Sequence, residues 1–180
     1  MEPIETGFKD LWLLKPKVFK DERGYFYESY NRQAFEKLGI TADFMQDNQS
    51  LSGKNIVRGL HFQAPPHAQG KLVRVIKGAV QDVVVDIRKN STTYGQHYSV
   101  DLTEDNFLML WIPPGFAHGF ATLEDNTIFS YKCTDTYHPE TEGGLLWNDR
   151  ELGIQWQAEN PILSPKDTKF APFSLFISPF

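Results

Sequence analysis

Residues 71–87 read KLVRVIKGAVQDVVVDI, two β-branched runs separated by a glycine and an alanine. Such runs favour strands, and Gly78-Ala79 between them predicts the tight turn of a hairpin. Similar short runs of β-branched and aromatic residues, divided by turn residues, recur along the chain. Short strands at this spacing predict an all-β sandwich or barrel rather than a parallel α/β sheet. The expected strands cover residues 25–30, 55–62, 71–77, 80–87, 107–112 and 127–133.

The rest of the chain shows one helical pattern and a long irregular tail. Asn31 can cap a short helix over 32–38, which Gly39 then ends. After Leu152 the sequence is irregular and rich in proline, and we expect this tail to wrap the barrel. Its apolar end, 173–180, is expected to pack against a partner subunit.

The composition fits one globular domain over residues 1–180. Hydrophobic residues make up 41% and charged residues 23%, which excludes a disordered or collagen-like chain. Aromatic residues reach 14%, which suits a β framework and a pocket for flat ligands. The 18 basic and 23 acidic residues give a net charge of −5, so nucleic acid is not an expected partner.

The cysteine content and the N-terminus bear on the cellular compartment. Cys133 is the only cysteine, so no internal disulfide can form, and its apolar neighbours indicate a buried thiol in a reducing compartment. The N-terminus lacks the basic and apolar regions of a signal peptide. No apolar stretch approaches the roughly 18 residues needed to span a bilayer. We therefore expect a cytoplasmic protein that does not act at a membrane.

Residues 112–120, IPPGFAHGF, contain a Pro-x-Gly-x-x-His pattern in which two prolines and a glycine force a turn before a strand. The pattern is that of the second motif of cupin barrels, where the histidine, here His118, is often a metal ligand. We therefore expect a cupin-type jelly-roll β-barrel with a few short helices.

The first cupin motif, in contrast, lacks its metal ligands. It requires His-x-His and a glutamate seven positions before a glycine, whereas this chain has His61-x-Gln63 and places Lys71 seven positions before Gly78. A protonated lysine cannot ligate a divalent cation and repels it by charge. His67 lies in a proline-containing loop and is expected to be exposed. No metal site is therefore expected.

Polar residues inside the expected strands are the candidates for chemistry, because burying an unpaired charge is costly. Lys71 shares its strand face with Val73, so we expect it to point into the barrel. Alternation alone places Arg58 and His61 on opposite faces of their strand. A bulge at Gly59 would redirect one of them, and the sequence leaves this open.

Several segments, taken in order, resemble those of the dTDP-4-dehydrorhamnose 3,5-epimerase family. The resemblance runs from about Phe8 to Asp167, nearly the whole chain. It implies a cupin-type jelly roll that works as a homodimer without a metal or redox cofactor. The matching segments are DERGYF (21–26), QDNQS (46–50), VRGLHFQ (57–63), PPGFAHGF (113–120), 131–144, WND (147–149) and LSPKD (163–167).

The family reaction implied by this resemblance converts dTDP-4-dehydro-6-deoxy-D-glucose into dTDP-4-dehydro-L-rhamnose, in dTDP-L-rhamnose biosynthesis. The 4-keto group makes the hydrogens on carbons 3 and 5 removable, because the resulting carbanion delocalises onto oxygen as an enolate. By family match, His61 is the base, Asp167 is its carboxylate partner and Tyr131 is the acid. Lys71 is the expected stabiliser of the enolate oxygen.

Binding residues follow from the same resemblance and from the chemistry of a nucleotide sugar. A pyrophosphate requires basic side chains, and thymine requires a flat ring, here Tyr137, together with amide partners. Phe26 is expected to pack on the nucleotide. The expected substrate-binding set is Arg23, Phe26, Glu28, Gln46, Asp47, Asn48, Arg58, Lys71, His118, Tyr137, Glu142 and Lys166.

Three alternatives differ from this reading in their chemistry. A metal-dependent cupin enzyme conflicts with Gln63 and Lys71. A non-catalytic nucleotide-sugar-binding cupin need not keep Lys71 together with His61, Tyr131 and Asp167. An epimerase that inverts a single carbon of another nucleotide-linked 4-keto-6-deoxy sugar is left open, and double epimerisation is favoured because base, stabiliser and acid are all present.

Overall fold

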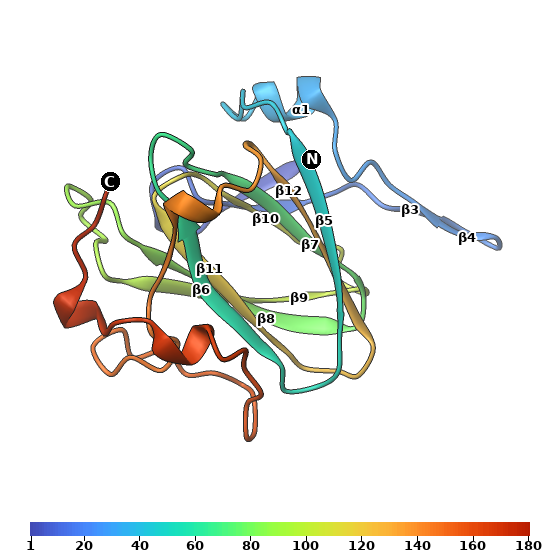
Figure 1. Ribbon diagram of the computed structural model, residues 1–180. Coiled ribbons are helices and arrows are strands. Elements are labelled where there is room, and N and C mark those ends of the chain that lie inside the picture. The colour runs from blue at the N-terminus through green and yellow to red at the C-terminus, as the bar shows by residue number, and fades with distance from the viewer.

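The computed structural model describes all residues from 1 to 180, folded mainly into two antiparallel sheets that face each other (Figure 1). This architecture confirms the expected all-β jelly roll. One sheet has the order β1 (Glu2–Glu5), β2 (Trp12–Lys15), β10 (Met109–Ile112), β7 (Lys71–Lys77), β12 (Thr127–Cys133) and β5 (Gln46–Ser52). The other has the order β13 (Glu142–Gly144), β6 (Val57–Gln63), β11 (Phe116–Thr122), β8 (Ala79–Asp86) and β9 (His97–Thr103).

The stretch that predicts the fold forms its two strands, but the expected hairpin is wrong. β7 pairs with β10 and β12, whereas β8 pairs with β11 and β9 in the other sheet. Gly78 is therefore a corner at which the chain passes from one sheet to the other. Its φ of +79° and the 2.5 Å that would separate a Cβ from Thr127 Oγ1 explain why a glycine stands there.

The main apolar core lies between the sheets and covers only part of the interior. Val73 and Val75 of β7 pack with Val80 and Val84 of β8 and with Phe129 of β12, all of them buried. Further along the same inward faces, the side chains become polar. The barrel is thus closed by apolar packing at one end and lined by polar groups at the other, where the cavities lie.

The expected helix is confirmed as α1 (Arg32–Glu36). The Asn31 side chain accepts a hydrogen bond from the Ala34 backbone N–H at 3.1 Å, and Phe35 is buried against the outer face of the six-stranded sheet. No helix in the structure has both the length and the apolar character that crossing a membrane requires.

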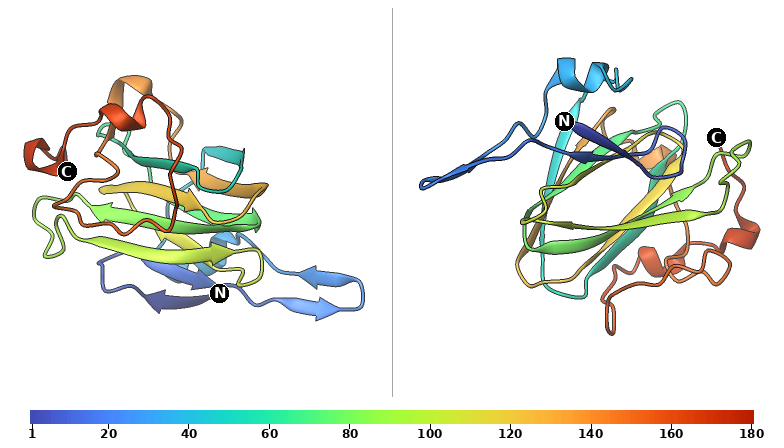
Figure 2. Two further views of the ribbon diagram at one scale, coloured as in Figure 1. Left: turned by 90° about the horizontal axis from the view of Figure 1, so that it is seen from below. Right: turned by 180° about the vertical axis from the view of Figure 1, so that it is seen from behind.

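A two-stranded arm, β3 (Phe19–Asp21) and β4 (Gly24–Phe26), projects away from the barrel (Figure 2). The strand expected over 25–30 is therefore too long. β4 ends at Phe26, and residues 27–30 lead from it to the Asn31 cap of the helix.

The C-terminal tail wraps the five-stranded sheet, as expected (Figure 1). It contains the short 3₁₀ turns η2 (Asp167–Lys169) and η3 (Phe173–Leu175), and η1 (Pro139–Thr141) precedes it. Phe173 is buried, and the Ser178 hydroxyl donates a hydrogen bond to the Ile87 carbonyl. The end of the tail thus packs on its own barrel, while Leu175 and Ile177 remain exposed.

Candidate active site

A bulge between β6 and β11 shapes the site. His118 pairs with His61, and two residues further on Phe120 pairs with Arg58, so three steps on β6 match two on β11. The extra residue brings Arg58 and His61 to one cavity, so the bulge at Gly59 that the sequence leaves open is present. Gly59 has a φ of +129°, and a Cβ there would lie 2.5 Å from the backbone of β11.

Two connected cavities occupy the polar end of the barrel. The larger has a volume of about 410 Å³ and contains all four expected catalytic residues. The smaller, of about 290 Å³, shares His61, Lys71 and Tyr131 with it. The larger is lined by Ile56, Val57, Arg58, His61, Lys71, His118, Phe120, Tyr131, Ile162, Leu163, Ser164, Lys166 and Asp167.

His61 and Asp167 form a tightly bonded pair. The Nε2 atom of His61 lies 2.6 Å from Oδ1 of Asp167, and the Gly59 backbone N–H donates to Oδ2 at 3.4 Å. Burial alone would raise the pKa of Asp167, but the hydrogen bond and charge of His61, with Gly59 and Ser164, hold it below its usual value. The carboxylate therefore stays ionised, orients the imidazole through Nε2 and leaves Nδ1 as the free ring nitrogen.

Lys71 begins β7 and borders both cavities, as its alternation with Val73 predicts. It forms no ion pair in the structure, and burial lowers the pKa of its ammonium, although Cys133, Asp82 and Glu142 act against this shift. A half-buried cation without a bonded carboxylate is costly, and a ligand oxygen that carries negative charge would offset this cost.

Tyr131 lies on β12, directly opposite Val73 on β7, and also borders both cavities. Burial raises the pKa of its hydroxyl, Cys133 adds to the rise and Arg58 opposes it. The phenol is therefore neutral near pH 7 and retains a proton that it can donate.

A second histidine–aspartate pair lies across the strands from the first. Nε2 of His118 is 2.9 Å and 3.1 Å from the two carboxylate oxygens of Asp82, and both residues are buried. Burial lowers the pKa of His118 in spite of the nearby carboxylate. The sequence reasoning missed Asp82. The signal that could have found it is an acid in the middle of the apolar run of β8.

Most of the residues expected to bind the thymine base line the smaller cavity. Gln46 and Asn48 of β5 line it together with Tyr137 and Glu142. The Tyr137 hydroxyl donates to Glu142 Oε2 at 2.8 Å, and its backbone N–H donates to Gln46 Oε1 at 2.9 Å. Glu142 also forms an ion pair with Lys166 of the larger cavity. The ion pair of Glu142 with Lys166 thus joins the linings of the two cavities.

Four expected binding residues border neither cavity. Arg23 and Phe26 are exposed on the arm, where Arg23 pairs with Asp21, and Glu28 is exposed just beyond it. Asp47 alternates with Gln46 and Asn48, so it lies on the opposite face of β5 and pairs there with Lys132. A single copy of the chain does not bring these four side chains to the site.

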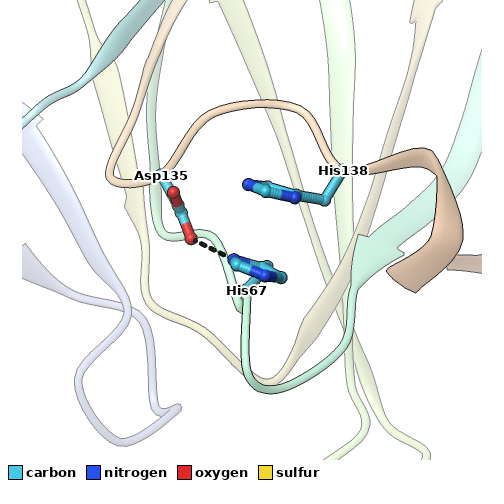
Figure 3. Close-up of side chains that lie close together, drawn as sticks. All are labelled: His67, Asp135 and His138. Atoms are coloured by element: carbon cyan, nitrogen blue, oxygen red, sulfur yellow. Dashed lines mark hydrogen bonds and ion pairs between the residues drawn. The ribbon is translucent and has the colours of Figure 1, made fainter.

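The expectation that His67 is exposed is wrong. Its ring is half-buried, stacks on the ring of His138 with the centroids 3.5 Å apart, and lies 3.1 Å from Asp135 Oδ2 (Figure 3). Gln63 stands where a metal-binding cupin has its second histidine and contacts the same two loops. Its amide donates to the His67 and Thr136 carbonyls at 2.6 Å and 3.0 Å.

Comparison with known proteins identifies the family of the chain. Residues 5–174 match the family model described as dTDP-4-dehydrorhamnose 3,5-epimerase. The enzyme of that name from Salmonella typhimurium is 55% identical over 166 residues, which cover 91% of both chains.

Two solved structures are similar over nearly their full length. The dTDP-4-dehydrorhamnose 3,5-epimerase of Bacillus anthracis, with TDP and PPi bound, has a TM-score of 0.93 at 48% identity and covers 95% of this chain and 98% of its own. The Legionella pneumophila enzyme in complex with dTDP-4-keto-L-rhamnose has a TM-score of 0.94 at 46% identity and covers 98% and 94%. The family model, the sequence relative and the structures agree: this chain belongs to the dTDP-4-dehydrorhamnose 3,5-epimerase family.

Proposed function

We propose that the larger cavity performs the reaction of this family with His61 as base, Lys71 as stabiliser of the enolate and Tyr131 as acid. The enzyme is an isomerase that converts dTDP-4-dehydro-6-deoxy-D-glucose into dTDP-4-dehydro-L-rhamnose, for dTDP-L-rhamnose biosynthesis. The observation that carries the assignment of roles is that a carboxylate-bound histidine, an unpaired ammonium and a neutral phenol border one cavity.

Each inversion is a proton removal followed by a proton return. Nδ1 of His61 takes the proton from a carbon next to the ketone. The electron pair of the C–H bond forms a double bond to carbon 4, and the negative charge moves to oxygen 4 as an enolate. The Lys71 ammonium stabilises this oxygen, and such a fixed donor is worth on the order of 10²–10³ in rate. Tyr131 then gives its proton to the carbon from the opposite side, which inverts it, and solvent restores both protonation states.

Asp167 acts on His61 rather than on the sugar. Its ionised carboxylate holds the imidazole in one tautomer and stabilises the imidazolium that forms after proton removal. The low pKa of Asp167 favours this role, because a protonated carboxyl group would neither fix the ring nor offset its charge.

The nucleotide is proposed to extend from the larger cavity toward the smaller one. Arg58 and Lys166 supply positive charge for the pyrophosphate, while His118 borders the sugar. The exposed Tyr137 ring offers a stacking surface for thymine, beside the amides of Gln46 and Asn48.

The working form is proposed to be a homodimer in which the arm enters the partner's site. The arm exposes the aromatic side chains of Phe19, Tyr25 and Phe26, and an isolated two-stranded hairpin is marginally stable in water. Docking on a second copy would bury these rings and bring Arg23, Phe26 and Glu28 to a nucleotide. Asp47 lies on the face of β5 away from the smaller cavity, where it pairs with Lys132, so it would contact a nucleotide only at the edge of that strand.

Mixing two defective variants tests the exchange of arms. We expect a dimer of His61→Asn with Arg23→Ala to contain one intact site, because one chain supplies His61 and the other supplies Arg23. Activity should therefore rise on mixing the two variants after dissociation and reassembly. No rise on mixing, with native mass spectrometry showing a mixed dimer, would contradict an Arg23 that acts on the partner's site.

The domain organisation and the cellular location of the enzyme are also part of the proposal. Residues 1–180 act as one cupin-like domain, because strands from both sheets and the tail line the same cavity. A cytoplasmic location is supported by Cys133, a free and buried thiol.

Proton NMR of the nucleotide sugar in deuterated water tests the reaction itself. We expect deuterium at carbons 3 and 5 of the product, since both hydrogens are replaced from solvent. Deuterium at one carbon only would contradict double epimerisation, and its absence from both would contradict the enolate route.

A further inference from the structure

We propose that His67, Asp135 and His138 form a binding site for a divalent transition-metal ion outside the catalytic cavity (Figure 3). His67 belongs to the loop between β6 and β7, whereas Asp135 and His138 belong to the loop that follows β12. One ligand atom from each residue lies within 4.8 Å of the other two. The site joins two loops that are far apart in the sequence.

The donor set selects the class of metal. Two imidazoles and one carboxylate suit Zn²⁺, Ni²⁺ or Cu²⁺, whereas Mg²⁺ and Ca²⁺ prefer oxygen ligands alone. Three protein ligands with partial exposure leave further positions for water. The His67 and His138 side chains are 35% and 28% exposed, so an ion can reach them from solvent.

Neighbouring side chains already select the nitrogen atoms that would bind. Nδ1 of His138 lies 3.0 Å from Glu140 Oε1, and a proton on this nitrogen leaves Nε2 free as the donor. Nε2 is 3.3 Å from the hydroxyl of Thr136, the residue next to Asp135. Nδ1 of His67 faces the Asp135 carboxylate at 3.1 Å. Glu140, held against the far nitrogen of His138, is a common kind of support for a metal ligand.

The backbones of the three ligands are held together independently of an ion. The amide of Gln63, a buried residue of β6, donates to the His67 carbonyl, and its oxygen accepts from the His138 N–H at 2.9 Å. The Gln69 amide donates to the Asp135 carbonyl at 2.8 Å. These contacts fix the separation of the two loops, so metal binding requires only side-chain movement.

The movement required is a change in the stacking of the two rings. They are parallel within 6°, with their centroids 3.5 Å apart, and Asp135 lies at one edge of the stack (Figure 3). Metal–nitrogen bonds of about 2.0–2.1 Å in a tetrahedral site place the donor atoms about 3.3 Å apart, so the rings must tilt toward the ion. The ion then takes the place of the proton between His67 and Asp135, and that proton moves to Nε2 of the same neutral ring.

The site borders the smaller cavity without forming part of the catalytic set. Gln63, Gln69 and Tyr137 all line that cavity, and Tyr137 directly precedes His138. A bound ion would therefore restrict the loop that presents the Tyr137 ring. The inference rests on the geometry of the three ligands and stands independently of the roles proposed for His61 and Tyr131.

Calorimetric titration of the metal-free full-length protein with Zn²⁺ tests the site. We expect one Zn²⁺ per chain at this position. His67→Ala and His138→Ala should each weaken binding by at least about tenfold, and Glu140→Gln by about tenfold as a change in a supporting residue.

Two controls separate this site from other histidines. His97→Ala removes a histidine of β9 that bonds to the Leu152 carbonyl, and His61→Asn removes the catalytic pair. Both should bind Zn²⁺ as the wild type does. Asp135→Asn preserves the shape of the side chain and replaces its charge, so it provides a readout if an alanine variant fails to fold by circular dichroism. Wild-type affinity in Asp135→Asn and His138→Ala, or no Zn²⁺ binding by the wild type, would overturn the proposal.

Discussion

Two histidine–aspartate pairs face each other across β6 and β11, and their histidine side chains differ in how accessible they are to a ligand. The His61 side chain is 29% exposed while its partner Asp167 is 4% exposed. The His118 and Asp82 side chains are 7% and 0% exposed. His61 can therefore meet a substrate with one ring nitrogen while the other is bound, whereas His118 borders the cavity as a fixed part of its wall.

The two carboxylates also reach their histidines by different routes. Asp82 lies on β8, which pairs with β11, so the register of one sheet brings it to His118. Asp167 lies on η2 in the tail, 106 positions after His61, and is held by Ser164 and Gly59. The same chemical pair is thus partly open to a ligand where the tail supplies the acid, and closed within the cavity wall where the sheet supplies it.

The largest expected effect is that of His61→Asn. Removing the base should lower the initial rate of product formation by about 10²–10⁴-fold, the usual contribution of a general base. His118→Asn is the matched control, because it removes a histidine from the other pair. It should mainly raise KM for the nucleotide sugar. Equal losses of kcat in the two variants would erase the distinction between the pairs.

Lys71→Met should lower kcat by about 10²–10³-fold, because it removes the cation that stabilises the enolate oxygen and keeps an apolar chain of similar length. Lys77→Met, an exposed residue at the other end of the same strand, provides the control. Steady-state kinetics distinguish the two. A change in KM alone for Lys71→Met would show that the ammonium binds the substrate and does not stabilise the enolate.

Tyr137→Ala should weaken binding of dTDP by about 1–3 kcal/mol, the usual range for the loss of a base–aromatic stack. The chemical step should change little, because the Tyr137 ring does not border the larger cavity, where Asp167 is bonded to His61. Calorimetry with dTDP and kcat at saturating substrate measure the two separately. Lost turnover with unchanged dTDP affinity would contradict the stacking role.

The buried His118–Asp82 pair should affect how the unfolding free energy depends on pH. Burial lowers the pKa of His118 below the value of about 6.5 in an unfolded chain, so the unfolded state binds more protons. Its contribution to the unfolding free energy is therefore complete above pH 6.5 and is lost as the pH falls toward the folded pKa. Urea unfolding between pH 8 and pH 5 should show this decline in the wild type and a flatter one in His118→Asn. The same decline of stability with falling pH in the wild type and in His118→Asn would contradict this role of His118.

The smallest expected effect is that of chelation. Turnover should be unchanged in EDTA, because Gln63 and the cationic Lys71 stand where metal-dependent cupins have ligands. The metal site proposed at His67 lies outside the catalytic cavity and does not alter this expectation. Loss of turnover in EDTA, restored by zinc, iron or manganese, would contradict it.

The sequence predicts the strands that are rich in β-branched and aromatic residues, including those that carry His61, Lys71 and Tyr131, but not the polar strand β5. β7 and β12 agree with the expected ranges because β-branched and aromatic residues fill them. β5 was missed because its QDNQS segment has low strand propensity, although it carries Gln46 and Asn48 into the smaller cavity. Short-range propensity cannot recover a strand that is held by pairing with β12.

Long-range pairing accounts for the other differences. The sequence predicts a hairpin turn at Gly78 because strands that are adjacent in sequence normally pair. The corner observed there arises because β7 and β8 pair with partners in different sheets. Family resemblance, and not spacing, matched Asp167 to His61. Asp82 and the cluster around His67 escaped notice because each joins segments distant in sequence. Arg23 and Phe26 border neither cavity of a single chain, so their expected role stays a prediction.

Deuterium exchange in Tyr131→Phe tests the division between base and acid most directly. If His61 removes the proton and Tyr131 returns one from the other side, Tyr131→Phe should let solvent deuterium enter the starting sugar without inversion. His61 takes the proton, exchanges it with solvent and returns it to the same face. His61→Asn should show neither exchange nor inversion. Wild-type inversion in Tyr131→Phe, or undiminished exchange in His61→Asn, would contradict the account.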